Sequence, residues 1–232
     1  MRSAIAALVV GLVALVLLAG LIALPEPGDP DSPARRHVSA EYIDAGAQAG
    51  GAANLVTAVL LNYRGLDTFG EVLVIFSALV AVLVVLASAP PTGSAQPAQR
   101  LAPSPVVAFI VRLMAPFMAS FAAFVMISGA HLPGGGFQGG VVLGAMTILL
   151  AVAMGRDRVA RMLRGGARFW VRAAAPLVFA LVALIGWAST GWWFGLPGPG
   201  PVRDALVLAL DIAIGVGGAA VLAGIFLALS RE

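Results

Sequence analysis

The chain contains no cysteine and few charged residues. Among its 232 residues, Asp, Glu, Lys and Arg together make up 11%. Without a thiol the chain cannot form a disulfide, attach haem through cysteine, or hold zinc or an iron–sulfur cluster through thiolates. We therefore expect no cofactor in this chain, and any redox chemistry would belong to a partner.

Lysine is also absent, and all 14 basic side chains are arginines. The formal net charge is +3, hydrophobic residues make up 60% of the chain, and the mean hydropathy is +1.00. An ordinary soluble domain is about one quarter charged. This composition predicts an integral membrane protein. The arginines lie beside apolar runs, which favours a role in orienting the chain in the bilayer over nucleic-acid binding.

Long apolar runs divide the chain into helices that could cross a bilayer. Five reach about 30 Å or more at roughly 1.5 Å per residue, and a shorter sixth begins inside a glycine-rich motif. The first run is longer than the core of a signal peptide, so we interpret it as a helix of the protein. The predicted fold is an all-α, polytopic membrane helix bundle with six transmembrane helices, at residues 3–24, 66–87, 105–130, 137–154, 173–194 and 204–229.

Residues 45–61 are the ambiguous segment, because polar residues and glycines interrupt their apolar run. We expect them to form a helix lying flat at the outer interface. The arginine-rich loop 155–172 should be cytoplasmic, which places both termini in the cytoplasm with ten arginines inside and four outside. A seven-helix chain with its N-terminus outside has a similar arginine bias, so charge alone leaves that alternative open.

The stretch 88–105 is rich in Pro, Ala and Ser without periodicity, which is typical of a flexible linker. It separates two predicted modules. The expected domains are an N-terminal membrane module at 1–87, a linker at 88–104 and a four-helix membrane module at 105–232.

The motif "GAHLPGGGFQGG", residues 129–140, interrupts two apolar runs. Proline and glycine should end the first helix there, because proline lacks an N–H and glycine readily takes positive φ. Glycines at every fourth position then form a side-chain-free stripe that lets another helix approach closely, and we expect a neighbouring subunit there. One interpretation is a tight outer hairpin; the other is unwound backbone that lines an ion or water path with His131 near its outer mouth. The motif residues assigned to packing are Pro133, Gly134, Gly135, Gly136, Phe137, Gly139, Gly140 and Gly144.

Two further sites carry charge into apolar runs. Arg64, Asp67 and Glu71 are spaced three and four apart, so on a helix they share a face. Glu71 and Asp211 lie within predicted spans, where a carboxylate is costly and usually functional. These four residues and His131 are our ion-path candidates. Structural alternatives are a helix-start role for Asp67 and a hydrogen-bonded packing role for Asp211. We identify no nucleophile with a base, no phosphate-binding loop and no set of metal ligands.

The motif "GAHLPGGGFQGGVVLGA" resembles the signature of the MnhB/MrpB family, which supplies the MrpB subunit of multisubunit Mrp-type sodium/proton antiporters. The four helices after residue 105 and the acidic residue of "LALDIAIGVGG", Asp211, are similar to that family as well. The segment "GAANLVTAVLLNYRGLDTFGEVLVIF" resembles the C-terminal end of the large MrpA subunit and a small subunit of membrane-bound hydrogenases. The resemblance implies a prokaryotic plasma-membrane complex related to the proton-pumping arm of respiratory complex I, with other membrane subunits, the lipid bilayer, Na⁺ and H⁺ as partners.

Three functions remain open at this point. The first is a non-enzymatic antiporter subunit that contributes to a sodium or proton path at an interface with a larger subunit. The second is a membrane-arm subunit of a respiratory or hydrogenase-type complex that is driven by a separate redox module. The third is a structural adaptor that conducts no ions.

Overall fold

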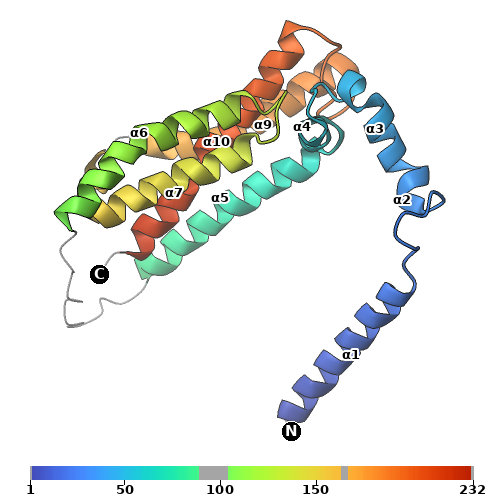
Figure 1. Ribbon diagram of the computed structural model, residues 1–232, viewed down its shortest axis with the longest axis horizontal. Coiled ribbons are helices and arrows are strands. Elements are labelled where there is room, and N and C mark those ends of the chain that lie inside the picture. Colours follow the sequence, from blue (N-terminus) through green and yellow to red (C-terminus); the bar gives the residue numbers. More distant parts are fainter. Residues whose placement is uncertain (1, 89–103, 163–166, 231–232) are drawn as a thin grey trace. The chain divides into compact units, whose positions relative to one another are not determined.

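The computed structural model describes residues 2–88, 104–162 and 167–230, and these residues form helices and turns without a strand (Figure 1). Its residue contacts divide the chain into two compact units, Met1–Glu41 and Tyr42–Glu232. The helices are labelled α1 to α10 in chain order, with one π-helical turn, η1. We describe each unit by itself.

The first unit is dominated by one apolar helix, α1 (Arg2–Ile22). Its residues Ala4–Ile22 are long and apolar enough to cross a bilayer. A short helix, α2 (Pro33–Arg36), follows, and Arg36 forms an ion pair with Asp31 at 2.7 Å. Helix α3 (Val38–Ala49) starts in this unit.

The second unit is a bundle built around the long helix α10. Helix α10 packs against α5, α6, α7 and α9, and these helices lie lengthwise side by side in Figure 1. Proline occupies the first position of both α6 and α10, where its missing N–H costs no helical hydrogen bond. The elements of this unit after α3 are α4 (Leu55–Ala58), η1 (Val59–Tyr63), α5 (Gly65–Ser88), α6 (Pro105–Ile127), α7 (Gly136–Met154), α8 (Arg156–Met162), α9 (Ala167–Thr190) and α10 (Pro201–Leu229).

An aromatic cluster joins α5, α9 and the loop that follows α9. The rings of Phe69, Phe179 and Phe194 lie with centroids 6.0 to 6.1 Å apart, and Phe179 and Phe194 are fully buried. A Cβ atom at Gly65 would lie 2.8 Å from Cγ of Phe194, so only glycine lets α5 begin this close to the loop. Helix α5 is thereby fixed within the bundle.

The prediction of six membrane-spanning helices is confirmed. Within the described residues, α1, α5, α6, α7, α9 and α10 are the helices long and apolar enough to cross a membrane. Their boundaries differ from the predicted ones by a few residues. Helix α6 ends at Ile127, three residues before the predicted end, and α10 starts at Pro201, three residues before the predicted start.

The single helix predicted at residues 45–61 is wrong. Helix α3 ends at Ala49, and Gly51 then adopts φ +85°, a backbone conformation that interrupts the helix. The chain becomes helical again only after Asn54, whose side-chain oxygen accepts a hydrogen bond from the N–H of Val56 at 3.1 Å. The segment is therefore two short helices with a turn between them.

The predicted linker at 88–104 lies almost wholly outside the described residues. On either side of it, α5 packs against α9 and α10. Helix α5 thus belongs to the same compact unit as the helices after the linker. The arginine-rich segment 155–172, expected as a loop, contains α8 and the start of α9.

Candidate functional site

The glycine turn, residues 128–135, connects α6 to α7. Gly134 and Gly135 adopt φ values of +138° and +125°, which other residues rarely take. The turn therefore breaks the chain where the sequence predicts, and for the predicted backbone reason. Pro133 in this turn is exposed.

The glycine stripe of α7 faces α10 of the same chain. A Cβ at Gly136 would lie 2.7 Å from Cβ of Ile214, and a Cβ at Gly140 would lie 2.7 Å from the carbonyl oxygen of Gly215. At Gly144 the nearest atoms belong to Leu222, at 3.2 Å. The expectation that this stripe receives a neighbouring subunit is therefore corrected: α10 already occupies it.

Two other residues of the motif face different neighbours. Gly139 lies against α6, where a Cβ would approach the carbonyl oxygen of Ala122 to 2.8 Å. Phe137 packs against the hydrophobic core of the bundle. Helix α7 is thus held closely on two sides, by α6 and by α10.

Asp211 reaches from α10 to the first residue of α7. Its Oδ1 accepts a hydrogen bond from the N–H of Gly136 at 2.8 Å, and the residue is only 3% exposed. The preceding residue, Gly135, has no side chain to cap the helix. Asp211 therefore satisfies one of the free N–H groups at the start of α7 and places a carboxylate at the positive end of the helix dipole.

The second carboxylate oxygen of Asp211 is in a different situation. Its Oδ2 is buried and has no hydrogen-bond partner. It lies against the backbone of Gly129, where an added Cβ would be 2.8 Å away. Asp211 is ten residues beyond the start of α10, or about 15 Å along the helix axis. This polar contact is therefore deep within the bundle.

Asn54 and Thr57 hold the glycine turn from the other side. The Nδ2 of Asn54 donates to the carbonyl oxygens of Gly129 and Leu132, at 2.9 and 2.8 Å. The hydroxyl of Thr57 donates to the same Gly129 oxygen at 2.6 Å. In the sequence these two residues stand out only as interruptions of an apolar run, and this role was not predicted. Their spacing of three, which places both on one side of a helical turn, was the available signal.

His131 borders an open cavity of about 350 Å³. Its charged and titratable walls come from His131, Arg203 and Asp204. The side chain of Arg203 is buried and lies over Gly51, with its Cδ 3.0 Å from the position of an added Cβ. Asp204 is exposed in the first turn of α10. The cavity therefore puts a polar wall beside the glycine turn.

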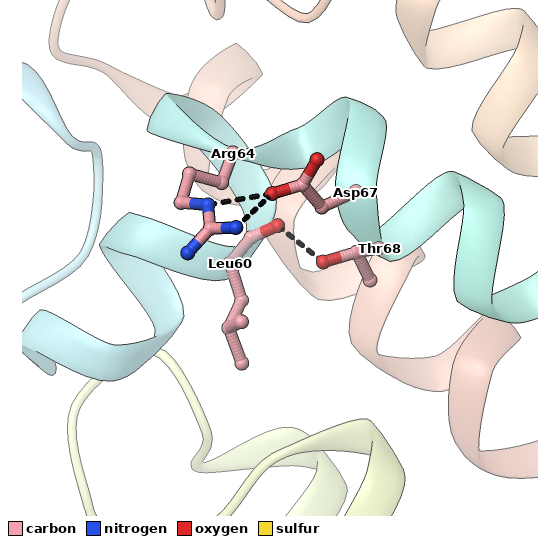
Figure 2. Close-up of polar contacts among 4 residues, drawn as sticks. All are labelled: Leu60, Arg64, Asp67 and Thr68. Atoms are coloured by element: carbon pink, nitrogen blue, oxygen red, sulfur yellow. Dashed lines mark hydrogen bonds and ion pairs between the residues drawn. The ribbon is translucent and has the colours of Figure 1, made fainter. Parts of the chain in front are cut away.

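Figure 2 shows that Arg64 and Asp67 form an ion pair at the start of α5. Both Nε and Nη2 of Arg64 lie 2.5 Å from Oδ2 of Asp67. In the same view, the hydroxyl of Thr68 donates to the carbonyl oxygen of Leu60 at 2.7 Å and closes the π-helical turn onto α5. Among the described residues Glu71 forms no ion pair and is exposed, so the predicted charged face contributes a pair and a separate carboxylate.

The structure thus brings some of the candidates together and leaves others apart. Asp211 contacts the glycine motif, and His131 lies in the same turn beside the cavity. The Arg64–Asp67 pair and Glu71 lie at the start of α5. In the described part of the chain, no three His, Asp or Glu side chains group in a way that could hold a metal ion.

Two family models match the chain. One, described as "Domain related to MnhB subunit of Na+/H+ antiporter", matches residues 106–227. The other, MbhE, describes a subunit of MBH and matches residues 6–100. The two matches together extend from α1 to α10.

Curated relatives are longer proteins. A relative from Rhizobium meliloti (strain 1021), a "Probable K(+)/H(+) antiporter" subunit named A/B, is 28% identical over 233 residues, covering 84% of this chain and 22% of the relative. The "Uncharacterized protein MJ1307" of Methanocaldococcus jannaschii is 30% identical over 118 residues, 45% of each protein. The chain thus spans less than half the length of either relative.

Two solved structures share the fold. A chain of the membrane-bound sulfane sulfur reductase, an archaeal respiratory membrane complex, superposes with a TM-score of 0.74 at 27% identity, covering 100% of this chain and 99% of that chain. A chain of the Mrp complex from Dietzia sp. DQ12-45-1b superposes with a TM-score of 0.68 at 24% identity, covering 100% of this chain and 26% of that chain. The first family model covers more than half of the sequence, from α6 to α10, and the chain therefore belongs to the family of domains related to the MnhB subunit of Na⁺/H⁺ antiporters.

Proposed function

We propose that the chain is a membrane subunit of a multisubunit monovalent cation/proton antiporter and contributes to an ion path at an interface with a larger subunit. The observation that carries this proposal is the family match across α6 to α10. The antiporter named for the Rhizobium meliloti relative supports it. In this proposal Na⁺ and H⁺ are the transported ions, and the chain is a transport component without a catalytic step of its own.

Glu71 supports a path at a subunit interface. It lies six residues beyond the start of α5, or about 9 Å along the axis of a membrane-spanning helix. Its side chain is exposed, whereas Thr68 and Val72 beside it are buried. A carboxylate at such a depth is costly in lipid, so a protein partner or a hydrated cavity should cover it. The partner is expected to be the larger subunit.

Asp211 and His131 complete the proposed route. His131 lies beside the open cavity next to the glycine turn, and Asp211 lies on the inner side of that turn with one oxygen free of hydrogen bonds. Carboxylate oxygens suit protons and hard cations such as Na⁺. In this route His131 stands near the outer mouth, and Asp211 holds an ion or a proton deeper in the membrane.

A second function is favoured by one specific observation. The chain of the sulfane sulfur reductase complex matches this chain over nearly the full length of both. A membrane-arm subunit of a redox-driven complex would use the same helices and the same carboxylates. Its redox groups would be held by other subunits, since this chain has no cysteine to ligate them.

The complex that contains this chain should be purified from native membranes, its subunits identified, and Na⁺-driven proton flux measured in proteoliposomes. We expect antiporter subunits and robust flux from the parent complex. Glu71→Gln should assemble normally and lower the flux several-fold, because it removes the exposed intramembrane carboxylate. Asp157→Asn, an exposed carboxylate in α8 outside the membrane-spanning helices, is the matched control and should leave the flux unchanged.

The outcome also separates the alternatives. Subunits with iron–sulfur or nickel–iron centres would establish the redox-driven function in place of the antiporter. Robust antiport by this chain alone would overturn its role as one of several required subunits. If both Glu71→Gln and Asp211→Asn complexes assemble and transport like the parent, the chain is a structural adaptor.

We also propose that both termini face the cytoplasm of a prokaryotic cell, with the chain crossing the plasma membrane six times. The chain has no native cysteine, so cysteines introduced at positions 3 and 40 can each be labelled uniquely. A membrane-impermeant thiol reagent added to intact cells should label position 40 and leave position 3 unlabelled. Labelling of position 3 from outside would instead support the seven-helix topology.

A further inference from the structure

An open groove of about 400 Å³ runs along one side of the bundle, between α7, α9 and α10. Its walls are almost entirely apolar, and along α10 it extends from Val216 to Leu227. This stretch is eleven residues, or about 16 Å at 1.5 Å per residue. The groove therefore has about the length of one leaflet of the roughly 30 Å hydrocarbon core.

The groove carries positive charge at one end. The guanidinium of Arg172, near the start of α9, lines it and lies over Gly224, where an added Cβ would be 2.7 Å from Nη2. At the same end, Nε of Arg156 donates to the carbonyl oxygen of the groove residue Leu227 at 3.2 Å. Helix α8, which begins with Arg156, also carries Arg158 and Arg161. The end near the C-terminus of α10 is therefore strongly basic, and the remainder of the groove is apolar.

We propose that this groove binds an anionic phospholipid, with its phosphate at Arg172 and one acyl chain along the apolar wall of α7 and α10. Charge complementarity selects the anionic headgroup, because basic sites between membrane helices favour lipid phosphates. The size of the groove selects a lipid over a helix. A helix is about 10 Å across, so one lying along 16 Å would occupy roughly 1,000 Å³ or more, whereas about 400 Å³ suits a single narrow ligand.

The proposed site is distinct from the candidate ion path. The groove is lined by residues from Leu143 onward in α7 and from Val216 onward in α10, whereas Asp211 contacts Gly136 at the start of α7. The proposal therefore holds whether the chain serves an antiporter or a redox-driven complex. A bound lipid there would seal the side of the bundle and brace α9 against α10.

The test uses the purified complex after removal of lipid in detergent. Binding of dioleoyl-phosphatidylglycerol, with dioleoyl-phosphatidylcholine as the neutral comparison, is measured by native mass spectrometry. The parent should bind phosphatidylglycerol more tightly than phosphatidylcholine. Arg172→Gln should weaken phosphatidylglycerol binding roughly fivefold, since one arginine near a lipid surface contributes that factor, and should leave phosphatidylcholine binding unchanged.

Two further variants locate the site in the groove. Ala220→Phe fills the apolar wall and should reduce binding of both lipids, whereas Ala209→Phe, exposed on α10 outside the groove, should not. Arg35→Gln, an exposed arginine in the first unit, is the charge control. Equal binding of both lipids by the parent would overturn the anionic specificity. Parent-like phosphatidylglycerol binding by Arg172→Gln would overturn the site even if Ala220→Phe failed to fold.

Discussion

Replacing Gly140 with leucine is expected to prevent stable folding of the helical bundle and assembly of the complex. An added Cβ would lie 2.7 Å from the carbonyl oxygen of Gly215 and 2.9 Å from its Cα. Both are backbone atoms of a packed helix, so α7 and α10 must separate to admit any side chain. Small overpacking changes in a core cost about 1–3 kcal/mol, and leucine at a backbone contact should exceed that.

Thermal unfolding of the full chain in detergent and the yield of assembled complex measure this effect. Gly140→Ala should already lower the unfolding temperature. The matched control is Gly218→Ala, which lies in the interior of α10 and has open space at its Cβ position. It should leave stability unchanged or raise it by up to about 1 kcal/mol, because alanine is the better helix former. Normal assembly of Gly140→Leu would show that the close contact of α7 with α10 is wrong.

Replacing Asp211 with alanine is expected to destabilise the start of α7. The N–H of Gly136 would lose its acceptor in a buried environment, which costs about 1–3 kcal/mol. Loss of a carboxylate at a helix N-terminus adds up to about 2 kcal/mol. Asp211→Asn keeps an oxygen that can accept the hydrogen bond, so it should assemble and stay closer to the parent in unfolding temperature. Its ion flux should nevertheless fall, because the amide cannot hold a proton or a cation as a carboxylate does.

The control for this series is Asp204→Ala, an exposed carboxylate in the first turn of the same helix. It should change the unfolding temperature little. An Asp211→Ala chain as stable as the parent would exclude the capping role. Parent-like flux from Asp211→Asn at several pH values would remove Asp211 from the ion path and leave it a purely structural contact.

Local properties of the sequence were sufficient to predict the six spans and the break at the glycine turn. Apolar run length depends only on neighbouring residues, and it placed all six helices within a few residues of their observed ends. The positive φ of Gly134 and Gly135 follows from the absence of a Cβ, which is also a local property. The placement of Asp211 within a span marked it as a residue that needs a partner.

The tertiary structure decided which partners these residues have. The glycine stripe could receive any close helix, and only the packing shows that it receives α10 of the same chain. Residues 45–61 form two short helices because the glycine turn offers carbonyl oxygens to Asn54 and Thr57, more than 70 positions away. Asp211 likewise meets Gly136 across 75 positions. Periodicity reports which face of a helix is special, whereas the contact of that face depends on how distant helices pack, and no local pattern contains that information.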